Sequence, residues 1–189
     1  MGISPVVISV IGFHGGSSPR DILRRKREDI ERNGLTYWLH RSWKSKPEAV
    51  QAACAMASDP YCLFVAAAGA TPENPYGSSR PTIMNEKARE WSANRLDWTK
   101  FQEAQSEVSG KVRDGSAHAL VFDRLDVVEA EEFVDLSGFM DMRDETPLRF
   151  FPNACSICCL ETPPGQFVSK RRRLFARGRL CSPFSVWLR

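Results

Sequence analysis

The first 43 residues constrain the fold more than any other stretch of the chain. Residues 5–13, Pro-Val-Val-Ile-Ser-Val-Ile-Gly-Phe, form an apolar run rich in β-branched side chains and predict a strand. Residues 14–18 interrupt this run with glycine and serine, residues 19–33 predict a helix, and residues 35–43 predict a second strand. This order of elements is typical of the beginning of an α/β sheet.

The ends of this helix carry local signals. Ser17 or Ser18 can cap its N-terminus, because a hydroxyl oxygen there accepts a hydrogen bond from a backbone N–H that lacks a helical partner. Pro19 suits the first helical position, where no N–H is needed. Gly34 favours the left-handed backbone conformation at which helices end.

Strands and helices continue to alternate after this unit. Residues 47–58 predict a helix and residues 61–67 predict a third strand. The order β-α-β-α-β favours an α/β fold with a mainly parallel sheet. The second half is richer in predicted strands, among them 117–123 and 154–160, so an α+β arrangement is the competing prediction.

A break in composition divides the chain near its end. Residues 162–165, Thr-Pro-Pro-Gly, are typical of a turn or boundary. We expect a single α/β domain over residues 1–161 and a basic C-terminal segment over residues 162–189. A length of 189 residues suits one domain of this kind.

The apolar run lengths, the cysteine count and the net charge exclude some classes of protein. No apolar run approaches the ~20 residues that a helix needs to cross a bilayer. Six cysteines with no recognisable secretion signal favour reduced thiols, so we expect a cytoplasmic or nuclear protein. The net charge of +3 is too small to indicate a polyanionic partner by itself.

The loop before the first helix is a candidate anion site. Gly15, Gly16, Ser17 and Ser18 would place backbone N–H groups at the positive end of the helix dipole, where phosphates and carboxylates bind. The loop lacks the lysine of a P-loop and does not match G-x-G-x-x-G. A tight strand-to-helix turn without a ligand is the alternative interpretation.

Two histidines are candidate catalytic residues. His14 adjoins the glycines of the loop, and an imidazole titrates near neutral pH. In a parallel sheet, His40 at the C-terminal end of its strand would reach the same crevice as the loop. Asp123 and Asp126, which follow the strand of His118, would orient a base. A core or surface position for each histidine is the alternative.

Cysteine spacing does not predict a metal site. Cys155 and Cys158 form one Cys-x-x-Cys pair, whereas a zinc site needs four ligands, usually from two such pairs. Buried strand thiols, which behave as small hydrophobic groups, are the preferred interpretation. We therefore predict no metal and no cofactor.

The C-terminal segment holds the densest positive charge. Its candidate contacts to nucleic acid or an acidic partner are Lys170, Arg171, Arg172, Arg173, Arg177 and Arg179. Binding of such a cluster to phosphates is favoured because it releases counterions from the nucleic acid, and the interleaved aromatic side chains can stack on bases. A solvated tail or an exposed helix face is the alternative.

These candidate sites lead to three hypotheses about function. The leading one is an intracellular binding protein whose basic segment contacts nucleic acid or an acidic protein. The alternative is a small hydrolase or transferase that acts on a nucleotide or another phosphorylated small molecule at the loop of residues 12–18. A third is an interaction protein without a small ligand. None of them involves a membrane.

Overall fold

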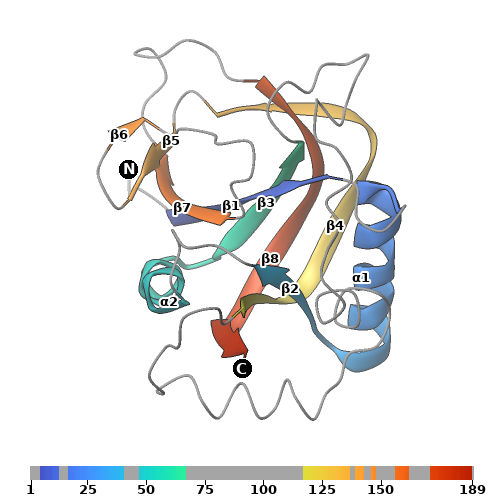
Figure 1. Cartoon of the computed structure of the whole chain (residues 1–189), viewed down its shortest axis with the longest axis horizontal. Helices are drawn as coiled ribbons and strands as arrows, with labels where there is room; N and C mark the ends of the chain where they lie inside the picture. Colours follow the sequence, from blue (N-terminus) through green and yellow to red (C-terminus); the bar gives the residue numbers. More distant parts are fainter. Residues whose placement is uncertain are drawn as a thin grey trace.

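The fold is known from a computed structural model, shown in Figure 1. The structure describes residues 5–12, 17–40, 47–66, 117–136, 139–142, 146–147, 156–161 and 171–188. The strands are β1 (Pro5–Ile11), β2 (Thr36–His40), β3 (Tyr61–Ala66), β4 (Ala117–Asp135), β5 (Phe139–Asp141), β6 (Thr146–Pro147), β7 (Ser156–Glu161) and β8 (Arg171–Leu188). The helices are α1 (Pro19–Asn33) and α2 (Pro47–Ala55).

These strands form one mixed sheet in the order β2-β4-β8-β3-β1-β7-β5-β6. The β1–β3 pair is parallel, and every other strand pair among the described residues is antiparallel. The prediction of an α/β fold with a mainly parallel sheet is therefore wrong, and the competing α+β prediction is closer. The physical reason is that β4 and β8 lie between β2 and β3, so β2 has only an antiparallel neighbour.

The first helix confirms the sequence prediction. α1 spans Pro19–Asn33, and the Ser18 hydroxyl oxygen accepts a hydrogen bond from the backbone N–H of Asp21. Gly34 closes the helix with φ of 81°, and its N–H donates to the Ile30 carbonyl at 2.7 Å. The strand predicted at residues 5–13 and the helix predicted at residues 47–58 are present but shorter, as Pro5–Ile11 and Pro47–Ala55. The strands predicted at residues 35–43 and 61–67 are present as Thr36–His40 and Tyr61–Ala66, and residues 41–43 and 67 lie outside the described residues.

Apolar side chains cover both faces of the sheet. On one face, Leu23 of α1 and Val50 of α2 pack into a single core with Phe64, Phe122 and other strand residues, so both helices lie on this side. We call it the helix-side core. A second cluster on the opposite face contains Ile8, Val65 and Leu174 and no helix residue. None of the helices in the described ranges is long and apolar enough to cross a membrane.

The two longest strands pair with each other through irregular points. Residues 122 and 124 of β4 oppose residues 180 and 179 of β8, so Asp123 is an extra residue in β4. Between Val127 and Glu132 the same strand has several extra residues, which include Glu129 and Glu131. Such bulges bend a strand and redirect side chains, and Figure 1 shows β4 curving across the top of the sheet.

Candidate functional site

The basic residues near the C-terminus lie inside the sheet. Arg171 to Leu188 form β8, which is hydrogen-bonded to β4 on one side and to β3 on the other. Residues 171–188 are therefore neither a solvated tail nor a helix. Of the predicted contact residues, Arg171, Arg172, Arg173, Arg177 and Arg179 belong to this strand, and Lys170 lies outside the described residues.

Charged side chains from β4 and β8 gather on the face of the sheet that is opposite the helices. Arg124 opposes Arg179 and Asp126 opposes Arg177 in the strand register. Leu125, between the two β4 residues, packs in the helix-side core, so its neighbours point to the other side. Asp123 and Glu132, which form ion pairs with Arg179 and Arg177, complete the group. The full set is Asp123, Arg124, Asp126, Glu132, Arg177 and Arg179. We call it the charged strand face.

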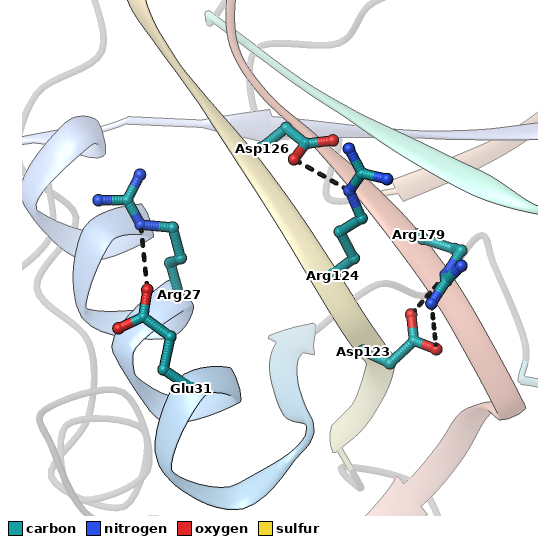
Figure 2. Close-up of polar contacts among 6 residues, drawn as sticks. All are labelled: Arg27, Glu31, Asp123, Arg124, Asp126 and Arg179. Carbon is teal, nitrogen blue, oxygen red and sulfur yellow. Dashed lines mark hydrogen bonds and ion pairs between the residues drawn. The ribbon is translucent and has the colours of Figure 1, made fainter.

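Each arginine of the charged strand face is paired with a carboxylate. The Arg179 guanidinium donates two hydrogen bonds to Asp123, from Nε at 2.8 Å and from Nη2 at 3.0 Å. Arg124 Nε donates to Asp126 Oδ1 at 3.1 Å. Figure 2 shows both pairs on the two adjacent strands.

The third pair joins Arg177 to Glu132. Nη1 of Arg177 donates to Glu132 Oε2 at 3.3 Å, and Nη2 donates to Oε1. The hydrogen bonds from Arg177 lower the pKa of the Glu132 carboxyl and, in return, raise the pKa of the arginine. The hydrogen bonds to Asp123 likewise raise the pKa of Arg179. The Arg177–Glu132 pair is thus fully ionised at neutral pH.

These pairs are open to solvent. The side chains are 64% and 56% exposed in the Arg124–Asp126 pair, 47% and 42% in the Arg177–Glu132 pair, and 50% and 31% in the Arg179–Asp123 pair. Ion pairs this exposed contribute little to stability, roughly 0–1 kcal/mol each. The charged strand face therefore presents three positive and three negative groups to solvent, and their pairing adds little to the stability of the fold.

A second group of ion pairs connects α1 to the irregular part of β4. Arg24 Nη2 lies 2.7 Å from Glu129 Oε2, and this hydrogen bond lowers the pKa of the Glu129 carboxyl. Arg20 Nη2 donates to the Ala130 carbonyl at 3.3 Å. Arg173 Nη1 lies 3.3 Å from Glu131 Oε1. Arg20 and Arg24 thus contact β4 from α1, and Arg173 contacts β4 from β8.

The remaining β8 arginines also have local contacts. The guanidinium of Arg171 lies over the Phe133 ring, with Cζ 5.4 Å from the ring centroid. Burial lowers the pKa of Arg172, and its Nη1 donates to the Arg171 carbonyl at 3.3 Å. The structure thus spreads the described arginines of this run, residues 171–179, over different surroundings and does not gather them into one positive patch.

The N-terminus of α1 already holds a carboxylate. Ser18 Oγ donates to Asp21 Oδ2 at 2.5 Å, and this hydrogen bond lowers the pKa of the Asp21 carboxyl. The negative charge of Asp21 occupies the positive end of the helix dipole, where the sequence predicted an external anion. Ser17 is half-buried beside it, whereas His14, Gly15 and Gly16 lie outside the described residues.

The structure does not bring His40 to the predicted loop. β2 lies at one edge of the sheet, and β4, β8 and β3 separate it from β1. The strand pairings make β2 run opposite to β1, so the C-terminal ends of these two strands lie at opposite ends of the sheet. His40 instead opposes His118 in the register of β2 and β4.

The cysteine pair is only partly described. Cys158 opposes Val7 in the register of β7 and β1, whereas Cys155 lies outside the described residues. Elsewhere, burial raises the pKa of the Cys54 thiol to about 12 and that of the Cys181 thiol to about 11. No group of three or more side chains of the metal-binding types gathers among the described residues.

The partners of the β8 arginines are what sequence reasoning missed. The acids of residues 123–132 were visible as an acidic stretch, but nothing in the sequence indicates that β4 pairs with β8 along this length. One sequence signal could have identified a strand there: the charged residues Arg177 and Arg179 alternate with the small or apolar residues Ala176, Gly178 and Leu180.

No protein-family model, curated protein or solved structure matches this chain.

Proposed function

We propose that the protein is a non-enzymatic, intracellular binding protein that contacts a protein partner through the charged strand face. The observation that carries the proposal is the pairing of Arg124, Arg177 and Arg179 with carboxylates on an exposed part of the sheet. The leading sequence hypothesis named nucleic acid or an acidic protein as the partner. The paired acids favour a protein whose own surface carries both signs of charge.

Charge balance argues against a polyanion as the main partner. Nucleic acid binding depends on the release of counterions by unneutralised lysines and arginines. On the charged strand face, three arginines are matched by three carboxylates, so the long-range attraction for phosphates is weak. The acids would also repel phosphates at short range.

Fixed arginines suit a specific protein contact. A guanidinium has five donors in a planar fork, and the bidentate bond from Arg179 to Asp123 uses only two of them. The remaining donors of this group are held in place for a partner. Because exposed ion pairs are weak, a partner carboxylate can join or replace the internal one with a small loss in free energy.

Thiol chemistry supports an intracellular location. Cys54 and Cys181 are free thiols and do not form disulfides. Reduced thiols are usual in proteins of the cytosol and nucleus. The cytoplasm or the nucleus is therefore the compartment that we propose.

Binding to a fluorescent oligonucleotide tests the choice of partner. The matched variants are an acid-neutralised form, Asp123→Asn, Asp126→Asn and Glu132→Gln, and an arginine-neutralised form, Arg177→Gln and Arg179→Gln. We expect weak, shallowly salt-dependent binding by the wild type, and a gain of steeply salt-dependent binding by the acid-neutralised form. Tight wild-type binding that is lost in the arginine-neutralised form would instead identify a nucleic-acid-binding protein.

Site-specific photocrosslinking tests the surface itself. A crosslinker at Asp126 samples the charged strand face, and one at Glu28, an exposed residue of α1 on the opposite side, is the control. We expect a defined protein adduct from position 126 alone. The purified partner should bind the wild type but not a charge swap, Arg177→Glu with Glu132→Arg, which keeps the internal ion pair and reverses the pattern. Equal binding to both forms would remove the charged strand face as the site.

A further inference from the structure

An aspartate and an arginine oppose each other within the charged strand face. Asp126 of β4 is the register partner of Arg177 of β8, and the two strands are antiparallel neighbours. Both side chains are exposed on the side of the sheet opposite the helices. At this level of the sheet, β4 therefore presents a negative group and β8 presents a positive one.

Neither group uses all of its hydrogen-bonding capacity within the chain. Arg124 Nε donates to Oδ1 of Asp126, so Oδ2 of this carboxylate is available to another donor. Arg177 donates two hydrogen bonds to Glu132, although a guanidinium has five N–H donors. Asp126 and Arg177 can thus keep their internal bonds and still bond to an opposing surface.

We propose that the charged strand face binds the same face of a second copy of this chain, about a two-fold axis that runs between β4 and β8, parallel to the strands. This inference rests on the proposed function and names its protein partner. Rotation about such an axis turns two sheets face to face and exchanges left and right, so β4 of each copy lies over β8 of the other. Asp126 of one copy then meets Arg177 of the second, and the symmetry makes this contact twice.

The dimensions of stacked sheets suit this arrangement. Two sheets that pack face to face lie about 10 Å apart with their strands nearly aligned. At that spacing a long arginine side chain of one sheet can reach a short aspartate of the other. Because the face carries both signs of charge, it can pair with itself, whereas a face of one sign would repel its copy.

One row of the face opposes association and is offset by a neighbouring acid. Arg124 and Arg179 are register partners, so the same rotation brings two arginines over each other at their level. Asp123 lies at this level too and holds Arg179 by two hydrogen bonds. Its negative charge reduces the repulsion, so the contact between Asp126 and Arg177 dominates.

The charged strand face is small, so the dimer should be weak. Stable interfaces bury about 800 Å² on each partner and use about 20–30 residues a side. The charged strand face has six charged side chains, and exposed ion pairs contribute little free energy each. We therefore expect a reversible dimer with a Kd on the order of micromolar, weakened by salt.

Sedimentation of two complementary variants gives the decisive test. We expect the wild type to dimerise in analytical ultracentrifugation, and Arg177→Glu and Asp126→Arg each to raise Kd at least about tenfold, because each places two like-charged pairs in the interface. An equimolar mixture of the two variants should associate again. In that mixture the two substituted positions face each other with opposite charges, and so do the unsubstituted Asp126 and Arg177.

A change of charge outside the face is the control. Glu28→Arg, at an exposed position of α1, should dimerise as the wild type does. Full association of Arg177→Glu and Asp126→Arg on their own, or no association of their mixture, would overturn the two-fold arrangement. Salt keeps the test valid if a variant does not fold, because wild-type dimers that persist unchanged in about 1 M NaCl would contradict a charged interface.

The second copy and the proposed function can fail separately. If the partner is a second copy, the photocrosslinker at position 126 should give an adduct of twice the mass of the chain. A wild type that stays monomeric far above micromolar concentration, and whose position 126 captures a different protein, would overturn the second copy and leave the proposed function intact. A wild type that neither dimerises nor crosslinks from position 126 would overturn both.

Discussion

The ammonium group of Lys26 lies over the ring of Tyr37, with Nζ 4.6 Å from the ring centroid. The same ammonium is 4.0 Å from Asp29 Oδ2, and both side chains are almost completely buried. Asp29 also accepts a hydrogen bond from Thr36 Oγ1 at 3.4 Å. A buried polar cluster thus joins α1 to β2. Burial lowers the pKa of Lys26 to about 8, because the charged amine is removed from water.

Stability should therefore rise with pH above about 8. The unfolded chain keeps the ordinary lysine pKa of 10.5, so between about pH 8 and 10.5 it binds more protons than the folded chain. Folding is then favoured by rising pH, by up to roughly 3 kcal/mol across the window, and this contribution is absent below pH 8. Urea unfolding of the wild type and Lys26→Met at several pH values measures it.

The difference between these two proteins isolates Lys26 from other titrating groups. We expect Lys26→Met to be the more stable form at pH 7. The difference in the free energy of unfolding between Lys26→Met and the wild type should shrink as the pH approaches 10. Arg27→Met, one residue along the helix and half exposed, is the control and should follow the wild type. A gap that is constant over this range would contradict a lowered pKa.

Gly178 is required by packing. A Cβ built at this position in β8 would lie 2.6 Å from Phe122 Cδ1 and 3.2 Å from Leu125 Cδ1. Both neighbours belong to the helix-side core and have little room to move. We expect Gly178→Ala to destabilise the protein by about 1–3 kcal/mol, measured by urea unfolding.

Gly34 gives the matched comparison. A Cβ there meets nothing within 4 Å, but φ is +81°, so Gly34→Ala costs about 1 kcal/mol through backbone strain alone. Phe122→Leu should partly restore Gly178→Ala and leave Gly34→Ala unchanged. If Phe122→Leu does not help Gly178→Ala, the steric explanation is incorrect.

Local signals explain what the sequence could predict. The bounds of α1 follow from the Ser18 cap, Pro19 at the first position and Gly34 at the end, all of which act within one turn of the helix. The apolar strand β3 follows from a run of buried side chains. Such features need no knowledge of distant residues.

Sheet order could not be predicted in this way. The β-α-β-α-β pattern suggested parallel neighbours at the N-terminus, but β2 pairs with β4. The deciding factor is the long β4–β8 pairing, whose register depends on contacts between segments that are far apart in the sequence. The same dependence hid the charged strand face and the opposition of His40 and His118, since both exist only once β4 has its neighbours.

The thiols of Cys54 and Cys181 should react slowly in the folded protein. Burial raises both pKa values, to about 12 and about 11, so the thiolate that attacks an alkylating reagent is scarce at neutral pH. We expect iodoacetamide at pH 7.5 to label both at least about tenfold more slowly than a solvated thiol. Peptide-resolved mass spectrometry gives each rate, and unfolding in urea should remove the protection. Native labelling at the rate of glutathione would contradict this.

Ser18 should control the ionisation of Asp21. The Ser18 hydroxyl bonds the Asp21 carboxylate and is the main reason why the pKa of this group is lowered. In Ser18→Ala, carboxyl-detected NMR should show the Asp21 pKa rising toward its ordinary value. Since the Ser18 oxygen also caps α1, urea unfolding should show a loss of about 1 kcal/mol.

The low pKa of Asp21 also determines how the cap depends on pH. A carboxyl with a lowered pKa stabilises the folded chain at pH values above its ordinary pKa, and this contribution is lost as the pH falls through the lowered value. The difference in stability between the wild type and Ser18→Ala should therefore decrease in acid. Ser17→Ala, which changes a neighbouring hydroxyl that does not cap the helix, is the control. If Ser17→Ala moved the Asp21 pKa as much as Ser18→Ala, the bond from Ser18 would not be its cause.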